Sequence, residues 1–167
     1  TADHAAFEAA DAAADGRDVL IPQGTFFLGD SVTMKSKCRF IGTVTMPADK
    51  HLTLDQNFNL PTYIDAFGSG ELGFRKAFQA MLKGPNHVEL DLGGRKIDVH
   101  APINLQDAVP DVDSFSNRRV ISNGTLSVVP GPNWDTDIFS SEATYNPATP
   151  RTLSDVQNVA NIPVGSL

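Results

Sequence analysis

Cysteine and tryptophan are nearly absent from this sequence, and long apolar runs are missing. The 167 residues include one cysteine, Cys38, one tryptophan, Trp134, and two tyrosines. A single cysteine excludes a disulfide within the chain, and its place in an alternating apolar stretch predicts a buried, inert thiol. No apolar run approaches the roughly 18 residues that a membrane-spanning helix needs. We therefore expect a globular chain that does not insert into a membrane.

Positive charge is scarce as well. The chain has 13 Lys and Arg against 20 Asp and Glu, a formal net charge of −7 at pH 7. This balance argues against a broad nucleic-acid-binding surface, because phosphate backbones would be repelled. The four histidines are scattered and have no cysteine partners, so we expect no metal site. Phosphate-binding and nucleophile-elbow motifs are missing too, and no cofactor is expected.

The two halves of the chain share one order of elements. In each half, an apolar helix is followed by short alternating segments, the first from Val19 and the second from Val88. The spacing between matched positions is wider at Arg39 and Arg119 than at Val19 and Val88, which predicts an inserted loop over 106–117. The start at Thr1, without Met or a leader-like segment, leads us to expect a piece of a longer protein.

Two helices are predicted from periodicity and capping residues. The first spans residues 5–14, with Asp3 as its N-cap and Gly16 just past its end. The second spans residues 74–82 and ends before Gly84 and Pro85. Its apolar stripe consists of Phe74, Ala77, Phe78, Met81 and Leu82. Its opposite, solvent-facing side consists of Arg75, Lys76, Gln79 and Lys83.

Short strands separated by turn residues predict a mainly β fold. Strands of three to five residues suit a right-handed parallel β-helix whose entrance is capped by short α-helices, here as two tandem helix-plus-β units. The alternative is an ordinary α+β domain with two βαβ-like units. We expect a first unit over 1–56, a linker over 57–72, a second unit over 73–129, and a loop-rich segment over 130–167 that leads to further coils.

The segments that carry these patterns resemble a known family. Residues 6–28, AFEAADAAADGRDVLIPQGTFFL, resemble the opening of the pectate-lyase-like right-handed β-helix domain of bacteriophage tailspikes. Residues 90–105, LDLGGRKIDVHAPINL, and 118–128, RRVISNGTLSV, resemble phage spike proteins still more. With the connecting residues 57–74, the tandem arrangement is similar to the spike proteins of gene transfer agents, which are phage-like particles of α-proteobacteria.

The resemblance implies a function and a setting. It implies an anchoring module of a homotrimeric spike that contacts other capsid or tail proteins and attaches the particle to bacterial surface polysaccharide. Such a spike sits on the particle surface, is assembled in the bacterial cytoplasm and is extracellular after release. The alternative is a fragment of a polysaccharide-degrading lyase or hydrolase. Whether the chain is an enzyme stays open, with a non-enzymatic role preferred for this fragment.

Carboxylate pairs are the formal catalytic candidates, because glycosidic cleavage uses two carboxylates across the scissile bond. The best pair is Asp135 with Asp137, because the neighbouring Trp134 ring could cover the apolar face of a sugar. Asp111 with Asp113, in the predicted inserted loop, forms a weaker candidate ligand-binding pair. Glu89 with Asp91, and Asp98 with His100, each share a strand face, and for both we favour a solvated surface role.

Overall fold

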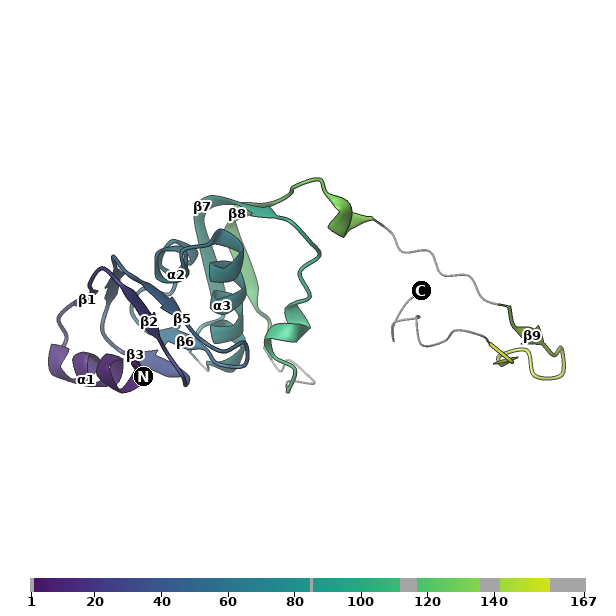
Figure 1. Cartoon of the computed structure of the whole chain (residues 1–167), viewed down its shortest axis with the longest axis horizontal. Helices are drawn as coiled ribbons and strands as arrows, with labels where there is room; N and C mark the ends of the chain where they lie inside the picture. Colours follow the sequence, from purple (N-terminus) through teal and green to yellow (C-terminus); the bar gives the residue numbers. More distant parts are fainter. Residues whose placement is uncertain (1, 85, 112–116, 136–141, 157–167) are drawn as a thin grey trace. The chain divides into compact units, whose positions relative to one another are not determined.

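The computed structural model describes residues 2–84, 86–111, 117–135 and 142–156. By internal contacts the chain divides into two compact units, residues 1–133 and residues 134–167. The first unit contains the three α-helices and the strands β1 to β8 (Figure 1). The second unit contains the short pair β9 (Thr144–Tyr145) and β10 (Leu153–Ser154), which is antiparallel. A 3-10 helix, η2 (Pro132–Trp134), lies where the first unit ends.

The first helix, α1 (His4–Ala14), confirms the prediction for residues 5–14. It buries Phe7 and Ala14 and ends at Asp15 and Gly16, both with positive φ. Asp3 occupies the N-cap position, but its side chain makes no capping hydrogen bond. Its carboxylate accepts a hydrogen bond from the backbone N–H of Phe27 at 2.8 Å instead. Asp3 therefore joins the start of α1 to the end of a strand.

Six three-residue strands follow, and the chain passes twice along the same path. The strands are β1 (Val19–Ile21), β2 (Thr25–Phe27), β3 (Val32–Met34), β4 (Cys38–Phe40), β5 (Thr43–Thr45) and β6 (Leu52–Leu54). Each strand of the first pass pairs in parallel with one strand of the second: β1 with β4, β2 with β5, and β3 with β6. The alternating inward side chains form the core between the strands, and it includes Ile21, Val32, Met34, Cys38, Phe40, Val44, Leu52 and Leu54.

Glycine allows the two passes to come this close. At Gly42, an added Cβ atom would lie 2.3 Å from the carbonyl oxygen of Pro22 and 2.6 Å from that of Gly24. No side chain fits between backbones at such a distance. The turn between β4 and β5 therefore packs directly on the turn between β1 and β2.

Asparagine side chains connect the second pass to the helices. The Asn57 amide accepts a hydrogen bond from Cys38 N–H at 3.1 Å and donates one to the Cys38 carbonyl at 2.7 Å. Asn59 then caps α2 (Leu60–Phe67), because its side-chain oxygen accepts from Thr62 N–H. The range 57–72, expected as a linker, thus contains a helix. The next helix, α3 (Gly70–Lys83), extends the predicted 74–82 by about one turn at its N-terminus.

Two longer strands complete the first unit. β7 (Glu89–Val99) pairs in parallel with β8 (Val120–Val128), and the register shifts between Asp91 and Arg95. The helices α2 and α3 both pack against β7, as Figure 1 shows for this part of the chain. Between β7 and β8 the described residues include a 3-10 helix, η1 (Leu105–Ala108), which packs against α3. The inward residues Leu90, Leu92, Ile97 and Val99 are buried.

The expectation of a right-handed parallel β-helix is wrong. The described residues form three α-helices and strands that pair only two by two, and they contain no solenoid. Parallel stacking begins in the first six strands, but it stops after the second pass. In place of a third pass of strands, the chain forms helices α2 and α3, which bury their own apolar faces. No continuous column of short strands therefore forms. Helices are accordingly a main layer of the core here and not short caps on a tube.

Candidate functional site

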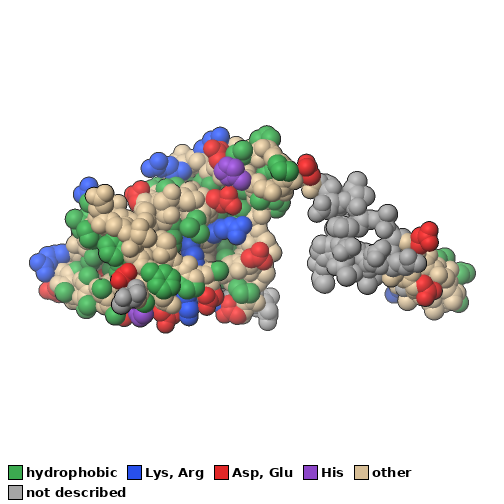
Figure 2. All heavy atoms as spheres, viewed as in Figure 1, with side chains coloured by type: hydrophobic (Ala, Val, Ile, Leu, Met, Phe, Trp, Pro, Cys, Tyr) green, Lys and Arg blue, Asp and Glu red, His purple; other side chains and the backbone are tan. Residues whose placement is uncertain are grey.

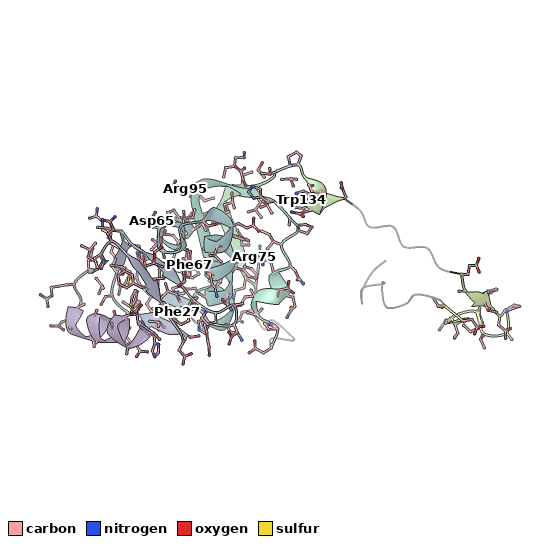
Figure 3. All side chains as sticks on the ribbon, in the orientation of Figure 1. Phe27, Asp65, Phe67, Arg75, Arg95 and Trp134 are labelled. Carbon is pink, nitrogen blue, oxygen red and sulfur yellow. The ribbon has the colours of Figure 1, made fainter. Side chains whose placement is uncertain are left out.

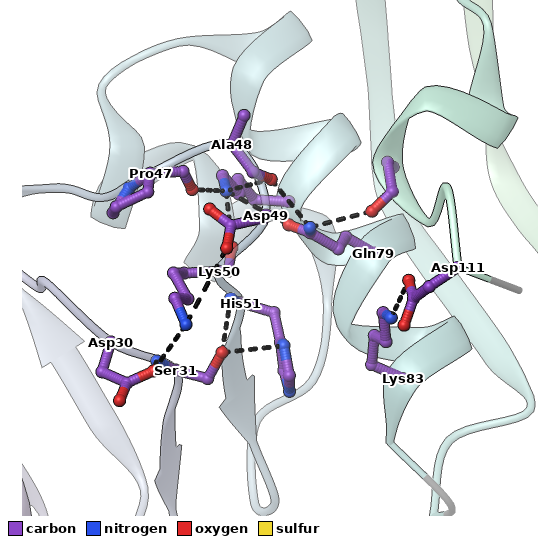
Figure 4. Close-up of polar contacts among 12 residues, drawn as sticks. Asp30, Ser31, Pro47, Ala48, Asp49, Lys50, His51, Gln79, Lys83 and Asp111 are labelled. Carbon is purple, nitrogen blue, oxygen red and sulfur yellow. Dashed lines mark hydrogen bonds and ion pairs between the residues drawn. The ribbon is translucent and has the colours of Figure 1, made fainter.

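The most concentrated group of buried polar side chains lies where α3 meets the loop between β5 and β6. We call it the Lys76 cluster, and it consists of Lys76 and Gln79 of α3 with the backbone of Pro47, Ala48, Lys50 and Ala108 (Figure 4). The loop turns at Pro47 to Lys50 and so directs several carbonyl oxygens toward the helix. These carbonyls need donors, because unpaired buried backbone oxygens are costly.

Lys76 supplies most of those donors. Its side chain is only 5% exposed. The ammonium Nζ donates to the carbonyls of Pro47 at 2.8 Å, Ala48 at 3.3 Å and Lys50 at 2.6 Å. A lysine ammonium has three N–H donors, and here the three loop carbonyls share them with one further acceptor, Gln79 Oε1. Lys76 therefore holds the loop in the way that a bound cation would.

Gln79 completes the network one turn further along α3. Its Oε1 accepts from Lys76 Nζ at 3.1 Å. Its Nε2 donates to the Ala48 carbonyl and to the Ala108 carbonyl, each at 2.8 Å. Gln79 thus connects the β5–β6 loop to the 3-10 helix η1, two segments that are far apart in the sequence. All the polar atoms of this buried amide have partners.

The environment of Lys76 disfavours its charge. Burial lowers the pKa of Lys76 from its ordinary value to about 8, while the negative charge of Asp49 acts in the opposite direction. No carboxylate forms an ion pair with Lys76 among the described residues. Lysines with lowered pKa values occur at catalytic sites, but structural networks produce the same shift. Here three loop carbonyls and Gln79 Oε1 already accept hydrogen bonds from the ammonium, which favours the structural role.

A small cavity adjoins the cluster. It has a volume of about 200 Å³, and its lining includes Ala48, Leu72, Arg75, Gln79, Asn104 and Asp107. Arg75 projects from α3 at this position (Figure 3). The Asn104 amide donates to the Asp107 carboxylate at 2.7 Å, so these two lining groups already hydrogen-bond each other. The cavity could hold a small polar molecule, but no catalytic pair of carboxylates lines it.

Ser31 and His51 form a second polar contact near the loop (Figure 4). The Ser31 hydroxyl lies 3.1 Å from His51 Nδ1 and accepts a hydrogen bond from the His51 backbone N–H, also at 3.1 Å. Burial lowers the pKa of His51, and nearby lysines, Lys83 first among them, act in the same direction. The imidazole is therefore favoured in its neutral form, and its tautomer decides whether Nδ1 accepts from the Ser31 hydroxyl or donates to it. Serine next to histidine is the arrangement of an activated nucleophile, but this hydroxyl mainly joins the start of β3 to the start of β6.

Of the Asp111 and Asp113 pair, the structure describes only Asp111. Asp111 forms an ion pair with Lys83 at the end of α3, and hydrogen bonding to Lys83 lowers the pKa of the Asp111 carboxyl. Asp111 is exposed, and it ties the loop after η1 to the helix. Asp113 lies outside the described residues. For Asp111 the structure therefore shows a structural ion pair.

Trp134 and Asp135 lie at the boundary of the two units. Trp134 lies at the end of η2 (Figure 3). Its side chain is partly exposed, and Asp135, the next residue, is exposed. Asp137 lies outside the described residues, so the distance between the two carboxylates is not part of the structure described. The ring and one carboxylate therefore remain a candidate sugar contact.

The strand-face pairs form hydrogen bonds with neighbours on the surface. Glu89 accepts from the Ser122 hydroxyl at 2.5 Å, and Asp91 accepts from the Asn123 amide at 2.9 Å and from Gly93 N–H at 2.7 Å. Asp98 forms an ion pair with Lys96 at 2.9 Å and does not pair with His100. His100 Nδ1 lies 3.6 Å from the carboxylate of Glu71 on α3. These side chains belong to a solvated surface, as we preferred from the sequence.

Cys38 is buried, as its sequence context predicts. Burial raises the pKa of its thiol to about 12, and the charges of Asp11 and Asp18 add to the shift. Within the described residues, no three or more His, Cys, Asp or Glu side chains come close enough together to hold a metal ion. In the same part of the chain, no helix is both long and apolar enough to cross a membrane.

The Lys76 cluster is absent from the sequence-based expectations. The helical pattern places Lys76 and Gln79 on the solvent side, and the structure buries both. The only available signal is the loop 47–50, whose carbonyls would need donors from elsewhere in the chain. Sequence alone does not show which helix supplies them.

No family model matches the chain, and no curated protein and no solved structure is significantly similar to it.

Proposed function

We propose that the chain is a non-catalytic attachment module of a spike on a phage-like particle, joined to other particle proteins and exposed to bacterial surface polysaccharide. The sequence motifs at 6–28 and 90–128 support this proposal through their resemblance to spike proteins. The β-helix that the resemblance implies is wrong for this chain, so the proposal needs support from the surface itself.

The observation that carries the proposal is the number of large apolar side chains exposed on strands and their ends. In the first unit they include Leu20, Phe27, Ile41, Val88, Ile121, Leu126 and Val128. Figure 2 shows green apolar side chains lying among charged ones over one face of this unit. Apolar side chains scattered singly over a surface are ordinary, whereas contiguous ones are typical of surfaces that contact other proteins, and Ile121, Leu126 and Val128 form such a contiguous row on β8. The best-buried polar groups, Lys76 and Gln79, are meanwhile used to hold loops.

The sugar contact is assigned to Trp134 and Asp135. A partly exposed indole can cover the C–H face of a sugar ring, and a neighbouring carboxylate accepts hydrogen bonds from its hydroxyls. The residues on both sides of Trp134, Asn133 and Asp135, are exposed and polar. This short segment therefore combines the group types that bind carbohydrates.

The test measures, by calorimetry, the affinity of the purified chain for capsular polysaccharide. We expect Trp134→Ala to weaken binding about tenfold or more, which corresponds to about 1.4 kcal/mol, because stacked aromatic rings dominate such contacts. Tyr145→Ala is the matched control, because Tyr145 is an exposed aromatic residue elsewhere in the second unit. Equal binding by wild type and Trp134→Ala contradicts the sugar contact.

The same incubation tests the enzymatic alternative. New reducing ends or unsaturated uronates, abolished by Asp135→Asn or Asp137→Asn, would show a hydrolase or lyase and overturn the non-catalytic assignment. An unchanged polysaccharide that still binds the chain supports the attachment module.

A further inference from the structure

Strand β8 has one edge that no strand of the described structure covers. It pairs only with β7, through bonds such as Val120 N–H to the Val88 carbonyl and Val129 N–H to the Val99 carbonyl. Backbone groups alternate between the two edges of a strand. Counting from Val120 and Val129, the backbone groups of Ile121, Leu126 and Val128 point away from β7. An edge of this kind is a template for adding another strand.

The apolar face of β8 is also incomplete. In the register of the sheet, Ile121 lies opposite Leu90, Leu126 opposite Ile97, and Val128 opposite Val99. Directly paired residues share one face, so all three β8 side chains lie on the face that β7 buries. The β7 residues are at most 5% exposed, whereas Ile121 is 39%, Leu126 49% and Val128 58% exposed. Among the described elements, the helices pack on β7, and β8 packs extensively only against β7.

Charge favours a second copy of the same strand as the occupant. No charged residue occurs in the β8 sequence VISNGTLSV, although the whole chain carries a net charge of −7. Two β8 strands can therefore meet without like-charge repulsion, which natural edge strands often use to prevent pairing. Arg118 and Arg119 come just before β8. In an antiparallel pair they lie at opposite ends, whereas parallel in-register strands would bring them together.

The irregularity at Asn123 sets the register of such a pair. Asn123 has a φ of 55°, and there β7 and β8 shift register. Because of this shift, the side chains of Ile121 and Leu126 lie on the same face of β8 and their backbone groups lie at the same edge, although the two residues are five positions apart. A two-fold axis between Asn123 and Gly124 then places Ile121 of each copy opposite Leu126 of the other. A two-fold interface requires this self-complementarity.

The geometry points to a homodimer in which two copies join their β8 strands antiparallel, with Ile121 and Leu126 packed across the two-fold axis. Ile121 and Leu126 exchange backbone hydrogen bonds, and Ser122 lies opposite Thr125 in the non-hydrogen-bonded pair beside them. The pairing extends the two-stranded sheet to four strands and brings the two open apolar rows side by side on one face. It differs from the homotrimer that the resemblance to spike proteins implies, and it does not depend on polysaccharide binding.

Sedimentation equilibrium of the full chain at about 10–500 µM tests this inference, a range suited to micromolar affinities. We expect a mass of twice the chain's 17.9 kDa, which falls to the monomer value in Ile121→Lys and in Leu126→Lys. Ile41→Lys is the control, because Ile41 is apolar and 60% exposed but lies away from β8. A wild-type monomer or trimer overturns the inference, and so does dissociation by Ile41→Lys.

Disulfide trapping gives a second test that does not introduce a buried charge. Ser122→Cys combined with Thr125→Cys places thiols across the axis at a Cα spacing of about 4.5 Å, within the range that a disulfide spans. Mild oxidation should give a covalent dimer on a non-reducing gel. Ser122→Cys alone should not, because the two Ser122 positions do not face each other. Equal cross-linking of the single and the double variant contradicts the register.

Discussion

Lys76 and Gln79 hydrogen-bond each other at 3.1 Å on the buried side of α3, and between them they hold four backbone carbonyls from two separate segments. The carbonyls belong to the β5–β6 loop and to η1. The pair therefore organises the part of the first unit where strands, helix and loop meet.

Removal of the Lys76 ammonium should destabilise the fold. Lys76→Met keeps much of the side-chain volume but removes the donor to the Lys50 carbonyl and leaves the Pro47 carbonyl with only its hydrogen bond from Lys50 N–H. We expect a loss of about 2–4 kcal/mol in the free energy of unfolding, because buried oxygens without partners bear their full desolvation cost. Urea unfolding measures it. Lys96→Met, which removes an exposed ion pair with Asp98, should change stability by less than about 1 kcal/mol.

Stability should depend on pH through Lys76. Burial lowers its pKa to about 8 in the folded chain, whereas an unfolded lysine titrates near 10.4. Between these values the unfolded chain binds more protons than the folded chain, so the free energy of unfolding rises with pH. The advantage of wild type over Lys76→Met should therefore widen between pH 8 and pH 10.4, by up to about 3 kcal/mol. A constant difference, measured by urea unfolding at several pH values, would contradict the lowered pKa.

Gly42 should not tolerate a side chain. Gly42→Ala places a methyl group 2.3 Å from the Pro22 carbonyl oxygen, a backbone atom that cannot move without separating the two passes of strands. We expect the free energy of unfolding, measured by thermal or urea unfolding, to fall by about 2–4 kcal/mol. The control is Gly131→Ala, since an added Cβ there meets nothing within 4 Å. Similar stability of both variants would show that the passes are not packed as described.

Cys38 should react only after unfolding. Burial raises the pKa of its thiol to about 12, so the thiolate that attacks alkylating reagents is scarce at pH 8. We expect labelling by iodoacetamide to be at least about 100-fold slower in the folded chain than in denaturant. Thr25→Cys, on the exposed side of β2, adds a thiol that should be labelled at once in the folded chain. Rapid labelling of both thiols, that of Cys38 and the one introduced at position 25, would show that the core opens readily.

Local patterns in the sequence were informative where a helical stripe or the alternation along a strand is enough to identify the buried side chains. The stripe from Phe74 to Met81 predicted α3 correctly, and alternation predicted the buried positions of Val32, Phe40 and Leu52. Leu20 shows the limit, because it is 55% exposed while its neighbour Ile21 is buried. In a three-residue strand, alternation alone does not identify the inward face. The fold class was wrong for a related reason: short strands and turns do not specify how many times the chain stacks.

The polar cluster could not be predicted from periodicity. Lys76 lies on the side of α3 away from the apolar stripe, and such a lysine is normally solvated. It is buried because the β5–β6 loop covers it, and that contact joins residues 26 to 29 positions apart. Helix α2 had a clearer signal, since Asn59 precedes Leu60 and Pro61 in the arrangement of an N-cap with proline in the first turn.

The side-chain amide of Asn57 has a consequence for how copies of this chain can associate. By bonding both the N–H and the carbonyl of Cys38, it occupies the hydrogen-bonding positions that an intruding strand would need on that side of β4. A strand that approached β4 from that side would therefore have to displace Asn57 from Cys38. At this position the chain protects a strand edge with one neutral side chain, without the charged side chains that edge strands more often carry.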